Sequence, residues 1–163
     1  MKKLLLVFLI VISSFSFAKE NPYKFIMSGN SSGKMDINHV TQEEMLKAGV
    51  AQSYIRKIIS YRDVKGNIEN IEELERISGI GKKTCKKLEK YFIIDRIPKI
   101  NHLYINKADD KTLRYYGFSK KEIKKIRNHL NKNGKIRSSI TLKKVISKSK
   151  YEKYKDIIEF DSY

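Results

Sequence analysis

An internal repeat constrains the fold of this chain more than any other feature of its sequence. Aligned with itself at a shift of 68 positions, residues 35–74 match residues 103–142. The shared positions are mainly glycines and helix-spaced isoleucines: Ile37/Ile105, Asn38/Asn106, Gly49/Gly117, Ile55/Ile123, Lys57/Lys125, Ile58/Ile126, Gly66/Gly134, Ile68/Ile136 and Leu74/Leu142. Beyond Leu142 the second copy is two residues shorter. Duplicated segments of this kind are typical of stacked modules, so we expect two similar folding units.

Helix signals recur at the same places in both copies. Thr41 and Glu44 form a capping box that satisfies backbone N–H groups of a first turn, and Asp109 caps the matching helix. Gly66 and Gly134 stand where left-handed glycines end helices. Apolar side chains fall on one helical face. The predicted core residues are Ile55, Ile58, Ile59, Leu74, Ile77, Cys85, Leu88 and Phe92 in the first copy, and Ile123, Ile126, Leu130, Leu142, Val145, Ile146, Tyr151, Tyr154 and Ile158 in the second.

No stretch of the sequence alternates apolar and polar residues with the period of two that a half-buried strand shows. We therefore predict an all-α fold of two tandem domains, each with about four short helices. The first unit is expected over residues 35–95 and the second over residues 103–163. Residues 96–102, which include Pro98, are predicted to be the linker between them.

The N-terminus has the pattern of an export signal. Lys2 and Lys3 precede an apolar run, and Ser16-Phe17-Ala18 supplies small residues for cleavage, so residues 1–18 are predicted to be a signal peptide. The alternative is a membrane anchor, but the apolar run is shorter than the ~20 residues that a bilayer requires. Residues 19–34 lack an apolar period and are expected to be a flexible leader. The mature protein is thus expected to be periplasmic or extracellular, and not integral to a membrane.

A glycine hairpin lies between the third and fourth predicted helices of the first unit. Gly-hydrophobic-Gly between two helices is the helix-hairpin-helix motif. Glycine lets a backbone approach a ligand closely, and N–H groups at a helix start can receive a phosphate. The predicted DNA-phosphate-binding residues are Gly79, Ile80, Gly81, Lys82, Lys83, Thr84, Lys86 and Lys87. None of these contacts reads a base edge, so binding would be independent of sequence. The alternative is a hairpin that only packs two helices, with Ile80 as a core plug.

Residues 37–94 resemble the DNA-receptor domain of the competence protein ComEA family. The residues that carry the resemblance are Asn38, Glu43-Glu44-Met45, Tyr61-Arg62, Gly66 and Gly79-Ile80-Gly81-Lys82-Lys83-Thr84. The resemblance extends, less closely, to the second unit, and implies two tandem helix-hairpin-helix domains, the second degenerate. It also implies an exported protein that binds double-stranded DNA without sequence preference during natural transformation, with DNA-uptake or secretion machinery of the envelope as a partner. No cofactor and no small-molecule substrate are expected.

Only one of the four expected hairpins keeps both glycines. The other three read Gly49-Val50-Ala51, Gly117-Phe118-Ser119 and Ser147-Lys148-Ser149. Alanine and serine can still begin a helix, and Ser119 is itself a good N-cap. We therefore expect the degenerate hairpins to keep the fold, and we do not transfer the phosphate-binding role to them.

The net charge of +17 is distributed unevenly. Residues 35–95 hold 11 Lys and Arg against 10 Asp and Glu, whereas residues 96–163 hold 19 against 7. A compositional bias toward lysine is the alternative explanation, but it does not account for a surplus in one unit. We expect the second unit to attract a polyanion while the first docks a phosphate. The lysines of this secondary basic surface are Lys120, Lys121, Lys124, Lys125, Lys143, Lys144, Lys148 and Lys150.

Two functional classes stay open: a DNA-binding protein, and a structural or adaptor protein of the cell envelope whose helical units make only protein contacts. Salt dependence separates them, because phosphate contacts release counterions. An enzyme is not expected, since neither a nucleophile nor a paired acid and base is evident. The single Cys85 excludes an internal disulfide and is expected to be a buried hydrophobe. With three scattered histidines, it offers no zinc site.

Overall fold

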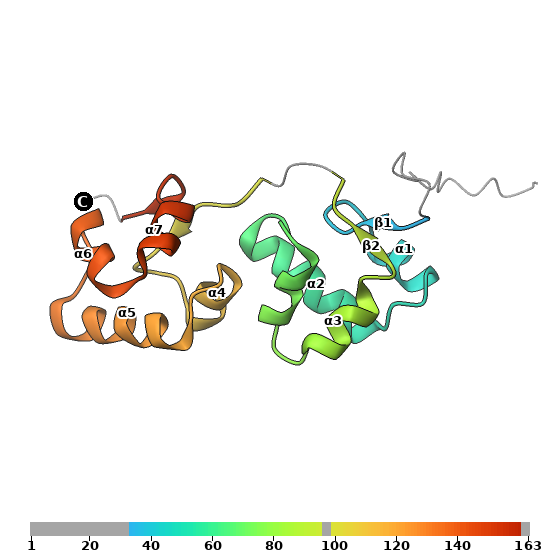
Figure 1. Ribbon diagram of the computed structural model, residues 1–163, viewed down its shortest axis with the longest axis horizontal. Helices are drawn as coiled ribbons and strands as arrows, with labels where there is room; N and C mark the ends of the chain where they lie inside the picture. The colour runs from blue at the N-terminus through green and yellow to red at the C-terminus, as the bar shows by residue number, and fades with distance from the viewer. Residues whose placement is uncertain (1–32, 96–98, 161–163) are drawn as a thin grey trace, which may run out of the picture.

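The computed structural model describes residues 33–95 and 99–160, so the predicted signal peptide and most of the predicted leader lie outside it. Its described residues form seven α-helices, one 3-10 helix and four two-residue strands, which confirms the all-α class (Figure 1). What we call the first unit contains α1 (Gln42–Lys47), α2 (Gln52–Lys65), η1 (Ile71–Arg76) and α3 (Lys82–Leu88). The second unit contains α4 (Asp110–Tyr115), α5 (Lys120–Asn133), α6 (Ser139–Val145) and α7 (Lys148–Tyr154). The third helix of the first unit, η1, is the 3-10 helix.

Each unit also has a short parallel strand pair that the sequence did not predict. β1 (Met35–Asp36) pairs with β2 (Phe92–Ile93), and β3 (Leu103–Tyr104) pairs with β4 (Ile158–Glu159). Phe92 and Ile158, expected on helices, are strand residues, although their side chains are buried as predicted. Two residues are too few to show a period in sequence. The pairs form because the beginning and end of each unit lie side by side.

The hydrophobic side chains form two cores. The first core extends from Ile37 to Phe92 and the second from Leu103 to Ile158. The predicted core residues are buried except Ile59, Leu130 and Tyr151, which are partly buried at the edges of the two cores. Cys85 is 1% exposed, as expected of a small buried hydrophobe, and its Sγ lies 3.3 Å from the carbonyl oxygen of Ile71. Burial raises the pKa of this thiol to about 11.

The repeat in the sequence appears again in the hydrogen bonds. The Asn38 side chain accepts from the N–H of Ile68 at 2.8 Å and donates to the same residue's carbonyl at 3.0 Å. Asn106 forms the same two bonds with Ile136, at 2.8 and 3.0 Å. These four residues are identical pairs in the self-alignment. The amide therefore explains why asparagine recurs at this position, since it satisfies both backbone groups of one residue in the irregular segment that follows the long helix.

The helix ends agree with the predicted caps, with one difference. Thr41 and Glu44 form the capping box, and Asp109 accepts the N–H of Thr112 at 2.7 Å. Gly66 and Gly134 end their helices with φ of 96° and 71°, as glycine allows. Their ψ angles of −82° and −133° lie outside the left-handed helical region. The chain therefore leaves α2 and α5 in a different direction from that predicted.

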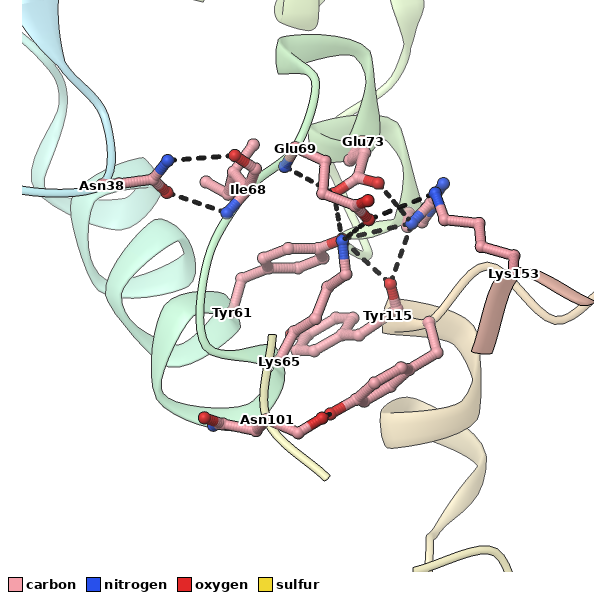
Figure 2. Close-up of polar contacts among 11 residues, drawn as sticks. Asn38, Tyr61, Lys65, Ile68, Glu69, Glu73, Asn101, Tyr115 and Lys153 are labelled. Atoms are coloured by element: carbon pink, nitrogen blue, oxygen red, sulfur yellow. Dashed lines mark hydrogen bonds and ion pairs between the residues drawn. The ribbon is translucent and has the colours of Figure 1, made fainter. Parts of the chain in front are cut away.

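The two units are joined by a polar network at the junction of α2, η1 and α4 (Figure 2). The Tyr61 hydroxyl donates to the Tyr115 carbonyl at 2.9 Å, and the two rings lie 4.6 Å apart. Lys65 has no exposed side-chain surface and pairs with Glu73 at 2.6 Å. Arg76 donates to Glu73 at 2.9 Å and to the Tyr115 carbonyl at 3.1 Å. Tyr115 thus belongs to the second unit but packs into the first core.

Part of the predicted linker is also fixed to the first unit. The N–H of Asn101 donates to the Lys65 carbonyl at 2.8 Å, at the end of α2. The Asn101 carbonyl in turn accepts from the Tyr116 hydroxyl at 2.9 Å. Residues 96–98 of the predicted linker are not among the residues that the structure describes. Across the described ranges no helix has the length and apolar character needed to cross a membrane.

Candidate nucleic-acid interface

The glycine hairpin connects η1 to α3. Ile80, at its centre, is 2% exposed and packs in the first core. Its N–H donates to the Ile77 carbonyl at 3.0 Å. Of the predicted site residues, Ile80 therefore anchors the hairpin and offers neither its side chain nor its N–H to a ligand. The exposed residues of the turn are Ser78 and the two glycines on either side of Ile80.

The two glycines are present for different reasons. Gly79 has a φ of 81°, a value that residues with a side chain rarely adopt, so the fold itself favours glycine there. Gly81 has an ordinary φ of −91°, and a Cβ added to it would meet nothing within 4 Å. The fold places no steric demand for glycine at position 81. Glycine would be required there if an external group approached the backbone closely.

The predicted lysines surround this exposed turn. Lys82, Lys83, Lys86 and Lys87 are exposed, while Thr84 is half-buried. Lys57, which was not among the predicted site residues, extends from α2 toward the hairpin. Its Nζ lies 2.6 Å from where a Cβ on Gly79 would stand. Only the packing of α2 against the hairpin brings this ammonium to the turn, so no local sequence signal pointed to it.

Two helix starts of the first unit, those of α2 and α3, have no side-chain cap. α2 begins after Ala51 and α3 after Gly81, and neither residue has a side chain that caps its helix. Among the hydrogen bonds of the described residues, none joins a carboxylate or hydroxyl to the N–H groups at these two starts. The first turns of both helices are therefore open to an external acceptor.

The equivalent starts in the second unit share one internal acceptor. Glu122 accepts from the N–H of Ser119 at 2.8 Å and from the N–H of Ser147 at 2.9 Å, at the starts of α5 and α7. Burial opposes the ionisation of Glu122, but these hydrogen bonds outweigh it and hold its pKa at about 2. The repeat places Tyr54 at the corresponding position of the first unit, where no carboxylate is available.

The fourth hairpin is displaced from its predicted position. The predicted hairpin was Ser147-Lys148-Ser149, but Ser147 is the N-cap of α7 and Lys148 is the first helical residue. The buried hairpin residue is Ile146, which is 6% exposed and corresponds to Ile80. α6 ends at Val145, so only two residues connect it to α7. The two-residue deletion after Leu142 moved the hairpin, and the shortened turn no longer contains a glycine.

Most of the predicted secondary basic surface is exposed. The exposed members are Lys120, Lys121, Lys124, Lys125, Lys143, Lys144 and Lys148. Lys150 differs, because it is half-buried with its Nζ 5.5 Å from the centre of the Tyr154 ring. Burial and the nearby Arg76 lower the pKa of Lys150. Lys150 therefore lies at the junction of the units and does not belong to the open surface. Residues 33–95 and 99–160 contain no group of three His, Cys, Asp or Glu residues placed to hold a metal ion.

Comparison with known proteins finds a motif-family match in the first part of the chain. Residues 30–93 match the family model described as "Helix-hairpin-helix motif". Over 62 residues the chain is 36% identical to ComE operon protein 1 of Bacillus subtilis strain 168, an alignment that covers 37% of this chain and 30% of that protein. Over 58 residues it is 38% identical to an uncharacterised protein of Haemophilus influenzae, covering 34% of this chain and 52% of that protein.

These relatives are similar to the chain over a limited region. The alignments span less than two thirds of the length of either relative. No solved structure matches the chain. The recognition of a helix-hairpin-helix, ComEA-like sequence is thus confirmed, at low identity and over a short stretch.

Proposed function

We propose, from the premise that residues 30–93 carry a helix-hairpin-helix motif, that this chain binds double-stranded DNA independently of sequence. The observation that carries the proposal is Gly81. Its backbone is ordinary and the space around it is empty, yet the residue lacks the side chain with which Ser, Thr or Asp would cap α3. A phosphate that approaches the backbone at the helix start explains the glycine.

The charges around the hairpin support the same ligand. Lys82, Lys83, Lys86 and Lys87 are exposed on α3, beside the uncapped start. Lysine ammonium groups and backbone N–H groups contact phosphate oxygens, which carry no sequence information. The site would therefore position a duplex without selecting a base sequence.

The second unit is proposed to be a degenerate helix-hairpin-helix domain that works mainly by long-range attraction. Glu122 occupies the two helix starts that a phosphate would need there. The exposed Lys120, Lys121, Lys124 and Lys125 of α5, in contrast, project a positive field into solvent. In this division of labour the second unit draws the polyanion toward the protein and the first unit docks it.

The biological role we propose is that of an exported DNA receptor in natural transformation, periplasmic or extracellular. The export pattern of residues 1–18 and the similarity to ComE operon protein 1 support it. Envelope DNA-uptake machinery would be the partner that receives the DNA. Because the aligned regions cover only part of each relative, this role is proposed for the chain and not transferred from them.

The test is fluorescence anisotropy of residues 19–163, which contain both cores, with a labelled random duplex at several salt concentrations. The logarithm of the affinity should fall with the logarithm of salt by about 0.9 per neutralised phosphate. Gly81→Asp should weaken binding at least about tenfold, because its carboxylate would repel a phosphate at this start. The helix should remain, since Asp is a good N-cap.

The matched control is Asn131→Asp, which adds the same charge at an exposed position of α5. It should change the affinity by less than about threefold. Equal effects of the two variants would place the DNA away from the hairpin. Absence of salt-dependent binding by the unmodified chain would favour the envelope adaptor.

A further inference from the structure

A basic cleft of about 360 Å³ lies between the two units, beside the glycine hairpin. Three parts of the chain line it, and they do not adjoin in sequence. The lining residues are Ser53, Arg56, Lys57 and Ser60 on α2, Ile77 and Ser78 before the hairpin, and Lys111, Arg114 and Tyr115 on α4. The two apolar residues are buried, so the side chains that face solvent are cationic or hydroxylic.

The spacing of these side chains puts them on single helical faces. The four residues of α2 follow the i, i+3, i+4, i+7 pattern, and Lys111 and Arg114 of α4 are three positions apart. Each unit therefore contributes two cations. The Lys111 ammonium lies 3.1 Å from the Ser60 hydroxyl, so the two helices already meet across the cleft.

The cleft is unusual because it gathers four cations and no carboxylate lines it, although the Asp109 carboxylate outside the lining attracts Lys111. No carboxylate is among its lining residues, and no ion pair of the described residues involves Arg56, Lys57 or Arg114. Elsewhere at the same junction, Lys65, Arg76 and Lys153 all pair with glutamates. Like charges around one cleft repel each other, and a bound anion offsets this electrostatic repulsion.

The cleft is continuous with the hairpin. Ser78 belongs to its lining and immediately precedes Gly79. Lys57 lines the cleft and also lies against Gly79, where a Cβ would stand 2.6 Å from its Nζ. A DNA strand with a phosphate at Gly81 would therefore extend beside this cleft.

We propose that the cleft is a second phosphate-binding site, which holds another backbone phosphate of the duplex docked at the hairpin. The inference rests on the proposed DNA binding and deepens it. Arg56 and Lys57 would contact the phosphate from the first unit, and Lys111 and Arg114 from the second. Since neither unit contains the whole site, both units must engage one duplex together, and the polar network that docks α4 on α2 builds the site.

The experiment compares two double variants of the same residues 19–163 by anisotropy. Arg56→Gln/Arg114→Gln removes one exposed cation from each side of the cleft. Lys132→Gln/Arg137→Gln removes two exposed cations that do not line the cleft, one near the end of α5 and one between α5 and α6. The cleft variant should raise the dissociation constant about tenfold and reduce the salt slope by about 1. The control should change the dissociation constant less than about threefold and keep the slope. Circular dichroism and thermal melting show that both variants are folded.

Each alternative outcome is distinct. If the two variants weaken binding equally, the cleft acts only through overall charge and this inference is overturned, while binding by the unmodified chain still supports the proposed function. If the unmodified chain binds no duplex, the proposed function and the inference both fail. If it binds vesicles of anionic lipid and only the cleft variant loses that binding, the cleft serves a lipid surface and the inference is overturned.

Discussion

Glu122 and Ser147 are joined by a hydrogen bond of 2.9 Å from the backbone N–H of the serine to the carboxylate of the glutamate. The other carboxylate oxygen accepts the N–H of Ser119 at 2.8 Å. One side chain thus connects the starts of α5 and α7, whose equivalents in the first unit begin after Ala51 and Gly81. The second unit carries its own anion at the place that the first unit leaves open.

This bridge should stabilise the fold. Glu122→Gln should lower the free energy of unfolding by about 1–2 kcal/mol at neutral pH, because an amide accepts weaker hydrogen bonds than a carboxylate. Urea unfolding followed by circular dichroism measures the change. Glu75→Gln, at an exposed glutamate of η1, is the control and should change stability by less than about 0.5 kcal/mol. Equal stability of Glu122→Gln and the control would show that the bridge adds nothing.

The same carboxylate should make stability dependent on acid pH. Its pKa is about 2 in the folded protein, below the ordinary value of 4.5. A depressed pKa stabilises the fold above the unfolded pKa, and this contribution is lost as the pH falls through the folded one. The stability difference between the unmodified chain and Glu122→Gln should therefore shrink between about pH 4.5 and pH 2. Urea titrations at several acidic pH values test this, and a constant difference would contradict it.

Two equivalent glycines should differ in their tolerance of alanine. A Cβ at Gly66 would lie 2.6 Å from the Lys99 carbonyl oxygen and 2.9 Å from the Asn101 nitrogen, whereas one at Gly134 would meet nothing within 4 Å. Both have positive φ, so Gly134→Ala should cost about 1–2 kcal/mol. Gly66→Ala should cost at least about 1 kcal/mol more, because backbone must move. Urea unfolding would measure both costs, and equal values would mean that the linker is not docked on α2.

The buried ion pair at the junction should be strongly sensitive to the loss of one partner. Glu73→Gln would leave the buried Lys65 with only Glu69, at 2.8 Å. We expect a loss of about 3 kcal/mol in unfolding free energy, because the buried ammonium would lose its buried carboxylate and keep only the partly exposed Glu69. Glu72→Gln changes the exposed neighbouring residue and is the matched control. A loss no larger than the control's would show that water reaches Lys65.

The lysines of α5 should act at long range. Replacing Lys120, Lys121, Lys124 and Lys125 by glutamine should raise the dissociation constant for DNA about tenfold at low salt. The difference should become small near 1 M salt, where the Debye length is about 3 Å. Anisotropy over a range of salt concentrations measures this. An unchanged affinity at low salt would show that these lysines of the second unit do not contribute to DNA binding.

Local chemistry was predictable in both units. The capping box of Thr41 and the cap of Asp109 depend on groups within one helical turn, so the sequence contains all of their partners. Buried side chains such as Ile58 and Leu142 follow helical spacing. The strand pairs were missed because each has two residues per strand and depends on the two ends of a unit meeting. The fourth hairpin was misplaced because a deletion shifts the register without leaving a glycine to mark it.

The sequence by itself determined a duplicated helical unit, its caps, its cores and the hairpin that resembles a DNA-binding motif. Only the tertiary structure decided which residues of the two units contact each other. Tyr61 and Tyr115 correspond in the repeat to His129 and Lys47, so they break the symmetry, but the alignment does not show that they bond to each other. The basic cleft is likewise formed only by the packing of the two units against each other. Its cations on α2 and α4 are more than 50 positions apart in sequence, and the packing that brings them together leaves no local or periodic pattern in the sequence.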